Sequence, residues 1–166
     1  MTDPTDRTDP TNRTDRFPVE TLDPSIGPTA SQAAGLTLKA ATTLIKAAKA
    51  AARERDIPIS VAVVDQGGQL VAFERMDGAS LVTITLAQDK AWTALVNRMP
   101  TRDLAPLVQP GAEFYGYESI ARGRTIVFAG GMPLERGGVL VGGVGVSGGS
   151  VDEDQEIVDA ALAAFA

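Results

Sequence analysis

The chain has 166 residues, of which 44% are hydrophobic and 22% charged, and its formal net charge is −6. This length suits one domain with a substantial core, and the acidic charge disfavours a nucleic-acid partner because phosphate backbones are also negative. The sequence has no histidine and no cysteine, which excludes disulfides, thiolate catalysis and the commonest metal ligand. Without a long apolar run or a signal-like N-terminus, we expect a cytoplasmic protein with no membrane partner.

The first 28 residues differ in composition from the rest. TDPTDR and TDPTNR follow one another with a six-residue period from Thr2 to Arg13. Threonine, aspartate, proline and arginine dominate, and too few apolar residues are present to offset the entropy of ordering. We predict a disordered tail over residues 1–28 and one folded domain over residues 29–166.

The first half of this domain has strong periodic signals. Apolar residues at helical spacing predict a helix over 31–55, which ends before Pro58 because proline biases its predecessor away from the helical region. A β-branched run over 59–65 predicts a strand, and a two-glycine turn returns the chain as a second strand over 69–75. A second helix is predicted over 80–96.

The second half is more broken. The predicted elements, in chain order, are short helices over 101–108 and 112–122, a third strand over 124–129, a loop over 130–133, a glycine-laced strand over 139–146 and a helix over 150–165. Ser150 caps the last helix, and carboxylates in its first turn complement the helix dipole. Strands joined by short glycine turns pair antiparallel. The order therefore predicts an α+β fold, with one antiparallel β-sheet flanked by helices.

The glycine-rich segment near the end contains a GxGxxG pattern at Gly143, Gly145 and Gly148. No βαβ unit follows it, and the next helix opens with acidic residues that would repel phosphate. We therefore expect no nucleotide site. The alternative interpretation is that these glycines let a helix or another chain approach the sheet closely.

Lys90 and a charged hairpin end are candidates for chemistry. Lys90 follows apolar residues three and four positions earlier, so it is either a surface lysine or a partly buried one. A buried lysine can serve as a base, a Schiff-base former or an anion clamp. Asp65, Arg75 and Asp77 lie at the ends of the predicted hairpin strands. They form either a structural ion pair or a charged rim around a ligand pocket.

Two tyrosines and a row of carboxylates complete the candidates. Tyr115 and Tyr117 lie two positions apart, so only one of them can face a pocket in a regular element. The carboxylates over 152–156 do not follow a calcium-loop pattern, and dipole complementarity explains them. We expect no metal site.

Three strings together resemble the GlcG/HbpS-like family, which includes the C-terminal domains of certain corrinoid adenosyltransferases. They are VAVVDQGGQLVAFERMDGAS, LAQDKAWTA and FAGGMPLERGGVLVGGVGVSGGSVDEDQEI. The resemblance covers about 36–165. It implies a profilin-like sheet between helices in α/β/α layers, assembly into dimers or higher homo-oligomers, and haem binding in some members. It also implies a ligand cavity that includes the helix carrying Lys90 and the Gly-Gly-Met-Pro segment.

This sequence departs from the family pattern at Gln69, where many members have a histidine after the Gly-Gly pair. A histidine-ligated haem is therefore excluded. Haem would instead be held by an oxygen ligand, by Lys90, by a methionine or by apolar packing alone. The candidate ligand-binding residues are Arg75, Met76, Asp77, Thr85, Lys90, Tyr115, Met132 and Pro133.

Two functional hypotheses follow. The first is a small-ligand binding protein for haem or a related tetrapyrrole, linked to haem or iron handling. The second is a cofactor-independent enzyme acting on a small carbonyl or carboxylate metabolite, with Lys90 as base or oxyanion clamp, Asp77 as its proton partner and Arg75 as the carboxylate anchor. A third possibility is an accessory subunit without a ligand. The expected partners are a small molecule and further copies of the chain.

Overall fold

In a computed structural model of the chain, residues 35–165 are described; the tail predicted over 1–28 lies outside them. One antiparallel sheet has the strand order β2-β1-β4-β3. Its strands are β1 (Ser60–Asp65), β2 (Leu70–Arg75), β3 (Gly131–Arg136) and β4 (Val139–Ser147). The two hairpins β1-β2 and β3-β4 are joined through the central pair β1-β4.

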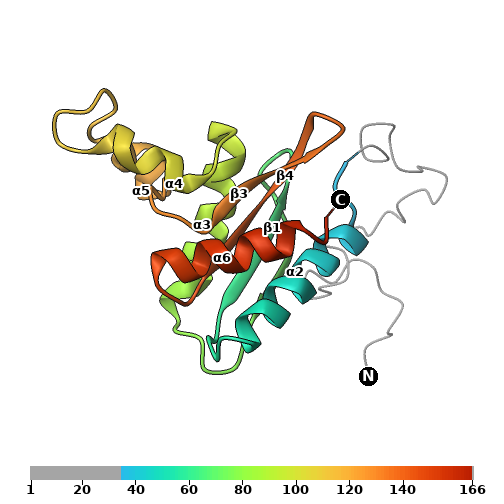
Figure 1. The fold of residues 1–166 in the computed structure, drawn as a ribbon. Helices are drawn as coiled ribbons and strands as arrows, with labels where there is room; N and C mark the ends of the chain where they lie inside the picture. The colour runs from blue at the N-terminus through green and yellow to red at the C-terminus, as the bar shows by residue number, and fades with distance from the viewer. Residues whose placement is uncertain (1–34, 166) are drawn as a thin grey trace, which may run out of the picture.

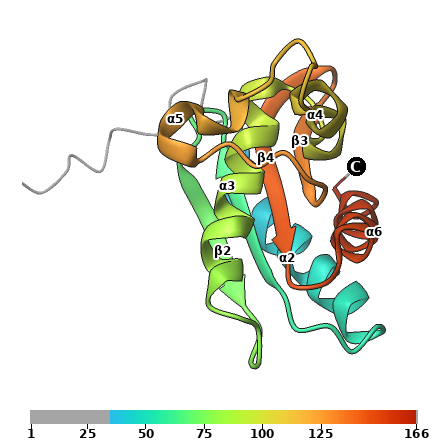
Figure 2. The same cartoon turned by 90° about the vertical axis from the view of Figure 1, so that its left-hand side faces the viewer.

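Helices cover both faces of this sheet (Figures 1 and 2). α2 (Leu38–Arg53) and α6 (Val151–Leu162) pack against each other on one face, and α3 (Val82–Asn97) packs on the other face. The predicted α+β fold with helices on an antiparallel sheet is therefore confirmed. No helix within residues 35–165 is long and apolar enough to cross a membrane.

The core lies in two clusters, one on each side of the sheet. Val61 and Val63 of β1 pack with the apolar faces of α2 and α6, whereas Ala62 and Val64 pack against α3. Successive residues of a strand point to opposite faces. Because β1 is covered on both faces, its sequence is continuously apolar from Val61 to Val64 instead of alternating.

α3 lies unusually close to β4 because β4 lacks side chains there. A Cβ on Gly143 would meet the carbonyl oxygen of Ala91, and a Cβ on Gly145 would meet the carbonyl oxygen of Ala87. Both carbonyls belong to α3. The hypothesis that these glycines permit a close helix approach is confirmed.

The strand predicted over 124–129 is wrong, and so is the loop predicted over 130–133. The third strand is β3, which begins at Gly131 and includes Pro133. The turn at Gly137–Gly138, with φ of 57° and 76°, folds β3 back onto β4. This pairing places β3 at the edge of the sheet, where a proline is tolerated, and residues 124–129 pair with no strand of this sheet.

The single helix predicted over 112–122 is also wrong. The chain there forms turns, η3 (Tyr117–Ser119) and the short α5 (Ile120–Gly123), in which Ala121 has φ of 54°. Gly116, with φ of 87°, breaks the helical path. The short helix predicted over 101–108 is confirmed as α4 (Thr101–Leu104) and η2 (Ala105–Val108).

Candidate functional site

Lys90 is the largest fully buried side chain of the described part of the chain, with 0% of its surface exposed. Its Nζ donates a hydrogen bond to Asp154 Oδ2 at 2.6 Å and another to the carbonyl oxygen of Val146 at 2.9 Å. The ammonium also lies 5.0 Å from the centre of the Phe128 ring. The two hydrogen bonds use two of the three donors of the ammonium, and the aromatic ring helps to shield its charge from water.

Two glycines adjoin the Lys90–Asp154 pair: Gly149 donates a hydrogen bond to Asp154, and Gly130 leaves space for the Lys90 side chain. Asp154 lies in the first turn of α6, and its Oδ1 accepts a hydrogen bond from the Gly149 amide at 2.9 Å. A Cβ on Gly130 would lie 2.9 Å from Lys90 Nζ and 3.0 Å from Asp154 Cβ. The ion pair thus connects α3, the end of β4 and the start of α6.

Burial acts on both members of the pair. It lowers the pKa of the Lys90 ammonium, while the negative charge of Asp154 opposes that shift. It also raises the pKa of the Asp154 carboxyl, while Lys90 and the Gly149 amide oppose that shift. Each charge is therefore maintained by the other, because desolvation would neutralise either one alone.

A polar side chain links this pair to the Gly-Gly-Met-Pro segment. Gln155 accepts a hydrogen bond from the Gly130 amide at 3.3 Å and donates to Met132 Sδ at 3.4 Å. Because Gly130 also lies against Lys90 Nζ, the structure places Lys90 close to the segment over 130–133. Pro133 follows on β3 and is half-buried.

The other predicted site residues lie elsewhere. Met76 and Asp77 line a separate hollow with Pro58. The carboxylate bonded to Lys90 is Asp154 and not Asp77, so the proton partner expected for Lys90 is wrong. Two further candidates, Arg75 and Thr85, are exposed on β2 and α3, and a third, Tyr115, is 66% exposed.

Sequence reasoning missed Asp154, Gln155 and Phe128. The first-turn acids of α6 were explained together by the helix dipole, and this holds for Glu153, which completes a capping box with Ser150. Asp154, however, shares a helical stripe with the buried Ile157, three positions on. That spacing is the signal that could have identified Asp154 as a buried carboxylate.

A mostly apolar cavity of about 230 Å³ lies between the end of α3 and the segment that follows it. Its lining residues are Asn97, Met99, Leu104, Leu107, Phe114 and Tyr117. The Tyr117 hydroxyl donates to Asn97 Oδ1 at 2.6 Å, and the Tyr117 and Phe114 rings lie 6.1 Å apart. Sites that bind small molecules typically have apolar walls with a small number of polar groups.

No group of three or more His, Cys, Asp or Glu side chains within residues 35–165 is arranged to hold a metal ion. Single side chains that could give an oxygen or sulfur ligand to a metal are the two tyrosines and the methionines.

The comparisons with known proteins agree with one another. The chain is 41% identical over 137 residues to the corrinoid adenosyltransferase PduO of Citrobacter freundii, covering 82% of this chain but only 41% of that protein. It resembles the solved PduOC:heme complex (42% identity, TM-score 0.76, 78% of this chain and 94% of that one). It also resembles the structure of HbpS (35% identity, TM-score 0.73, 84% and 96%).

The chain therefore spans about two fifths of the length of that adenosyltransferase. A family model described as haem-degrading protein HbpS-like matches residues 36–163, nearly all of the described structure. These findings agree with the strings that suggested the family. The chain belongs to the HbpS-like family.

Proposed function

We propose that this protein binds haem or a related tetrapyrrole, and that it holds the ring mainly by apolar contact. The observation that carries the proposal is the 42% identity to a chain solved as a haem complex, 94% of which is covered. A domain so similar in sequence and fold supports a related ligand. Bound haem would supply an iron centre that the side chains of this protein lack.

The apolar cavity at the end of α3 fits one edge of such a ring. Leu104, Leu107 and Phe114 provide the apolar surface, and Met99 provides a thioether beside it. With no histidine or cysteine in the chain, the candidate axial donors on the cavity wall are the Met99 thioether and the Tyr117 phenol. The phenol of Tyr115, which follows Phe114 in sequence, is a third candidate. Both kinds of donor are known from other haem proteins.

Lys90 and Met132 are less suited to this role. The Lys90 ammonium is fully buried and bonded to Asp154, and Met132 Sδ accepts a hydrogen bond from Gln155. Cations for the propionates are available nearer the cavity. Arg98 lies between the lining residues Asn97 and Met99, and Arg102 lies two positions before Leu104. Both are exposed and form no ion pair within residues 35–165.

A haemin titration followed at the Soret band tests the proposal. We expect saturable binding, weakened about tenfold or more by Leu107→Asp, because that change puts a charge on the apolar wall. Leu38→Asp is the matched control, because Leu38 is 60% exposed on α2 and is not among the cavity residues. Binding that does not saturate, or that Leu107→Asp leaves unchanged, would contradict this site.

Met99→Ala, Tyr117→Phe and Tyr115→Phe distinguish these donors. Loss of the axial donor should shift the Soret maximum while leaving most of the affinity from apolar packing. A spectrum unchanged in all three variants would mean that none of these residues ligates the iron.

The enzyme hypothesis requires a catalytic lysine that reaches its substrate. Burial does lower the pKa of Lys90, as in many catalytic lysines. The ammonium, however, has 0% exposure and is bonded to Asp154. We therefore favour the binding protein over the enzyme.

Self-association in the cytoplasm is part of the proposal. Leu81 and Val82 at the start of α3 are 72% and 60% exposed, and neighbouring apolar residues so exposed favour a protein interface. Light scattering after size exclusion should give a mass of at least two chains, reduced in Val82→Glu. The mass of one chain for the unmodified protein would contradict this part.

A further inference from the structure

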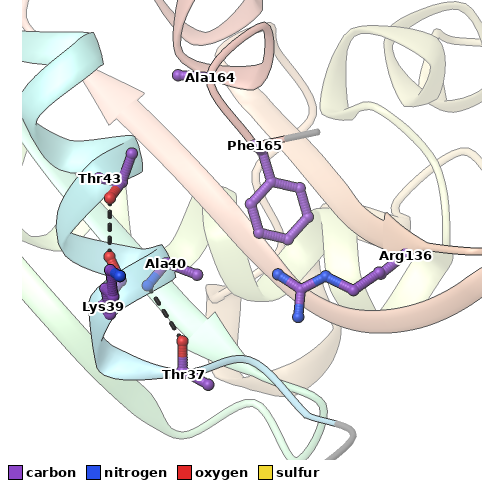
Figure 3. A pocket seen from close by; sticks show the side chains of 7 residues that line it. All are labelled: Thr37, Lys39, Ala40, Thr43, Arg136, Ala164 and Phe165. Atoms are coloured by element: carbon purple, nitrogen blue, oxygen red, sulfur yellow. Dashed lines mark hydrogen bonds between the residues drawn. The ribbon is translucent and has the colours of Figure 1, made fainter.

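A second cavity of about 210 Å³ lies on the opposite side of the sheet from α3 (Figure 3). Its walls come from the start of α2, the end of β3 and the segment after α6. The lining residues are Thr37, Lys39, Ala40, Thr43, Arg136, Ala164 and Phe165. None of them lines the apolar cavity proposed for haem.

The charges around this cavity have one sign. Lys39 and Arg136 are cations, and no described lining residue is acidic. The ion pairs within residues 35–165 involve other lysines and arginines, so these two have no ionic partner there. In a chain with a net charge of −6, two such cations on one cavity favour an anionic occupant.

Arg136 is held in place by an aromatic ring. Its Cζ lies 5.2 Å from the centre of the Phe165 ring, and Figure 3 shows the guanidinium pointing toward the start of α2. Stacking restricts the side chain and leaves the N–H groups at the edge of the guanidinium free to donate. Such a planar edge matches the two oxygens of a carboxylate.

A hydroxyl adds a further donor. Thr37 Oγ1 accepts a hydrogen bond from the Ala40 amide at 3.2 Å, which leaves its own O–H group available. The Thr43 hydroxyl is already committed, because it donates to the carbonyl oxygen of Lys39 at 2.9 Å. The cavity thus combines one fork-shaped cation, one ammonium and one hydroxyl donor.

We propose that this cavity binds a small organic carboxylate. Arg136 donates hydrogen bonds to both carboxylate oxygens, and the positive charge of Lys39 attracts the anion. The site is separate from the haem site, and either can fail without the other. Its mixed polar walls suit a short, polar molecule and not a tetrapyrrole ring.

Isothermal titration with succinate tests this assignment, with inorganic phosphate titrated in parallel. We expect saturable succinate binding that weakens about tenfold or more in Arg136→Gln and by a smaller factor in Lys39→Gln. Arg136→Lys should also weaken it, because lysine keeps the charge but loses the fork. Lys46→Gln, an exposed cation further along α2 that does not line the cavity, is the matched control.

The opposite results are as clear. No saturable heat with succinate, or equal affinity in Arg136→Gln and the unmodified protein, would overturn the site. Phosphate binding more tightly than succinate with the same dependence on Arg136 would overturn the carboxylate assignment. A haemin titration with and without succinate separates this ligand from haem propionates, because competition at Arg136 would show that the cavity serves the propionates instead. Thermal unfolding of each variant verifies that the fold is kept.

Discussion

Lys90 and Asp154 place two opposite charges inside the protein, where removing water from each costs several kcal/mol. The pair lies where α3, β4 and α6 meet, and its hydrogen bonds join one residue from each. Such a pair adds little stability compared with an apolar replacement of both residues. Removing one partner alone, however, strongly destabilises the fold, because the other charge stays buried without a counter-charge. Its contribution is to fix how the two helices sit across the sheet.

Removing only the lysine should therefore be costly. Lys90→Met leaves the Asp154 carboxylate buried and unpaired, and we expect the free energy of unfolding to fall by about 3–5 kcal/mol. Urea unfolding measures this change. Lys46→Met, at an exposed position on α2, is the control and should change stability by less than about 0.5 kcal/mol.

Replacing both partners should recover part of this loss. In Lys90→Met with Asp154→Leu, no charge is left buried, so the double variant should be more stable than Lys90→Met alone. A double variant that is less stable than the single one would show that the pair itself, and not the uncompensated charge, carries the energy.

Glu153 gives the protein a defined response to acid. The Ser150 amide and then its hydroxyl lower the pKa of Glu153 below its ordinary value of 4.5. The stabilisation is therefore complete above pH 4.5 and is lost as pH falls through the lowered pKa. Glu153→Gln keeps the cap but does not titrate, so its free energy of unfolding should fall less between pH 5 and about pH 3. Equal slopes for the two proteins would contradict this linkage.

The α3–β4 contact is the closest packing between elements in the described structure that depends on glycine. Gly145→Ala would place a methyl group against the carbonyl oxygen of Ala87, so strand and helix must separate. We expect a loss of about 1–3 kcal/mol or more, measured by urea unfolding. Gly67→Ala in the β1-β2 turn is the control, since its new Cβ would meet only the Asp65 carboxylate at 3.3 Å; an equal loss there would refute the packing argument.

Elements with strong local sequence signals could be predicted from the sequence. Elements that form only because they pair with a distant strand could not. β1 and β2 are recognisable from their β-branched residues and glycine turn, and α6 from its Ser150 cap. β3 was missed because Gly131 and Pro133 are poor strand formers, and only pairing with β4 makes them a strand. The run over 124–129 has the better strand sequence but no partner.

The candidate site shows the same limit. Lys90 could be singled out because apolar residues share its helix face, but its partner lies 64 positions away on another helix. Which carboxylate reaches it depends on how α3 and α6 pack across the sheet, and periodicity within one helix cannot give this. The family resemblance linked Lys90 with the segment over 130–133, because relatives share those strings, but it did not indicate Asp154.

The three candidate sites lie in different parts of the molecule. The apolar cavity lies at the end of α3, the basic cavity lies at the start of α2, and the buried ion pair lies where α3, β4 and α6 meet. They share no lining residue, and the sheet with its helices lies between them. We therefore expect ligand binding at one cavity to leave the affinity of the other unchanged.

The folded domain should not need residues 1–28. The buried hydrophobic residues of the described structure all lie between Ala41 and Ala161, and the Thr-Asp-Pro repeat has few apolar side chains to add to them. Deleting residues 1–28 should therefore change the melting temperature by less than about 2 °C, as scanning calorimetry would measure. A longer deletion, of residues 1–34, is the more demanding comparison. It would bring the new N-terminus next to Leu36, which packs on the core. A fall of more than about 4 °C on losing residues 1–28 alone would mean that this segment packs on the domain.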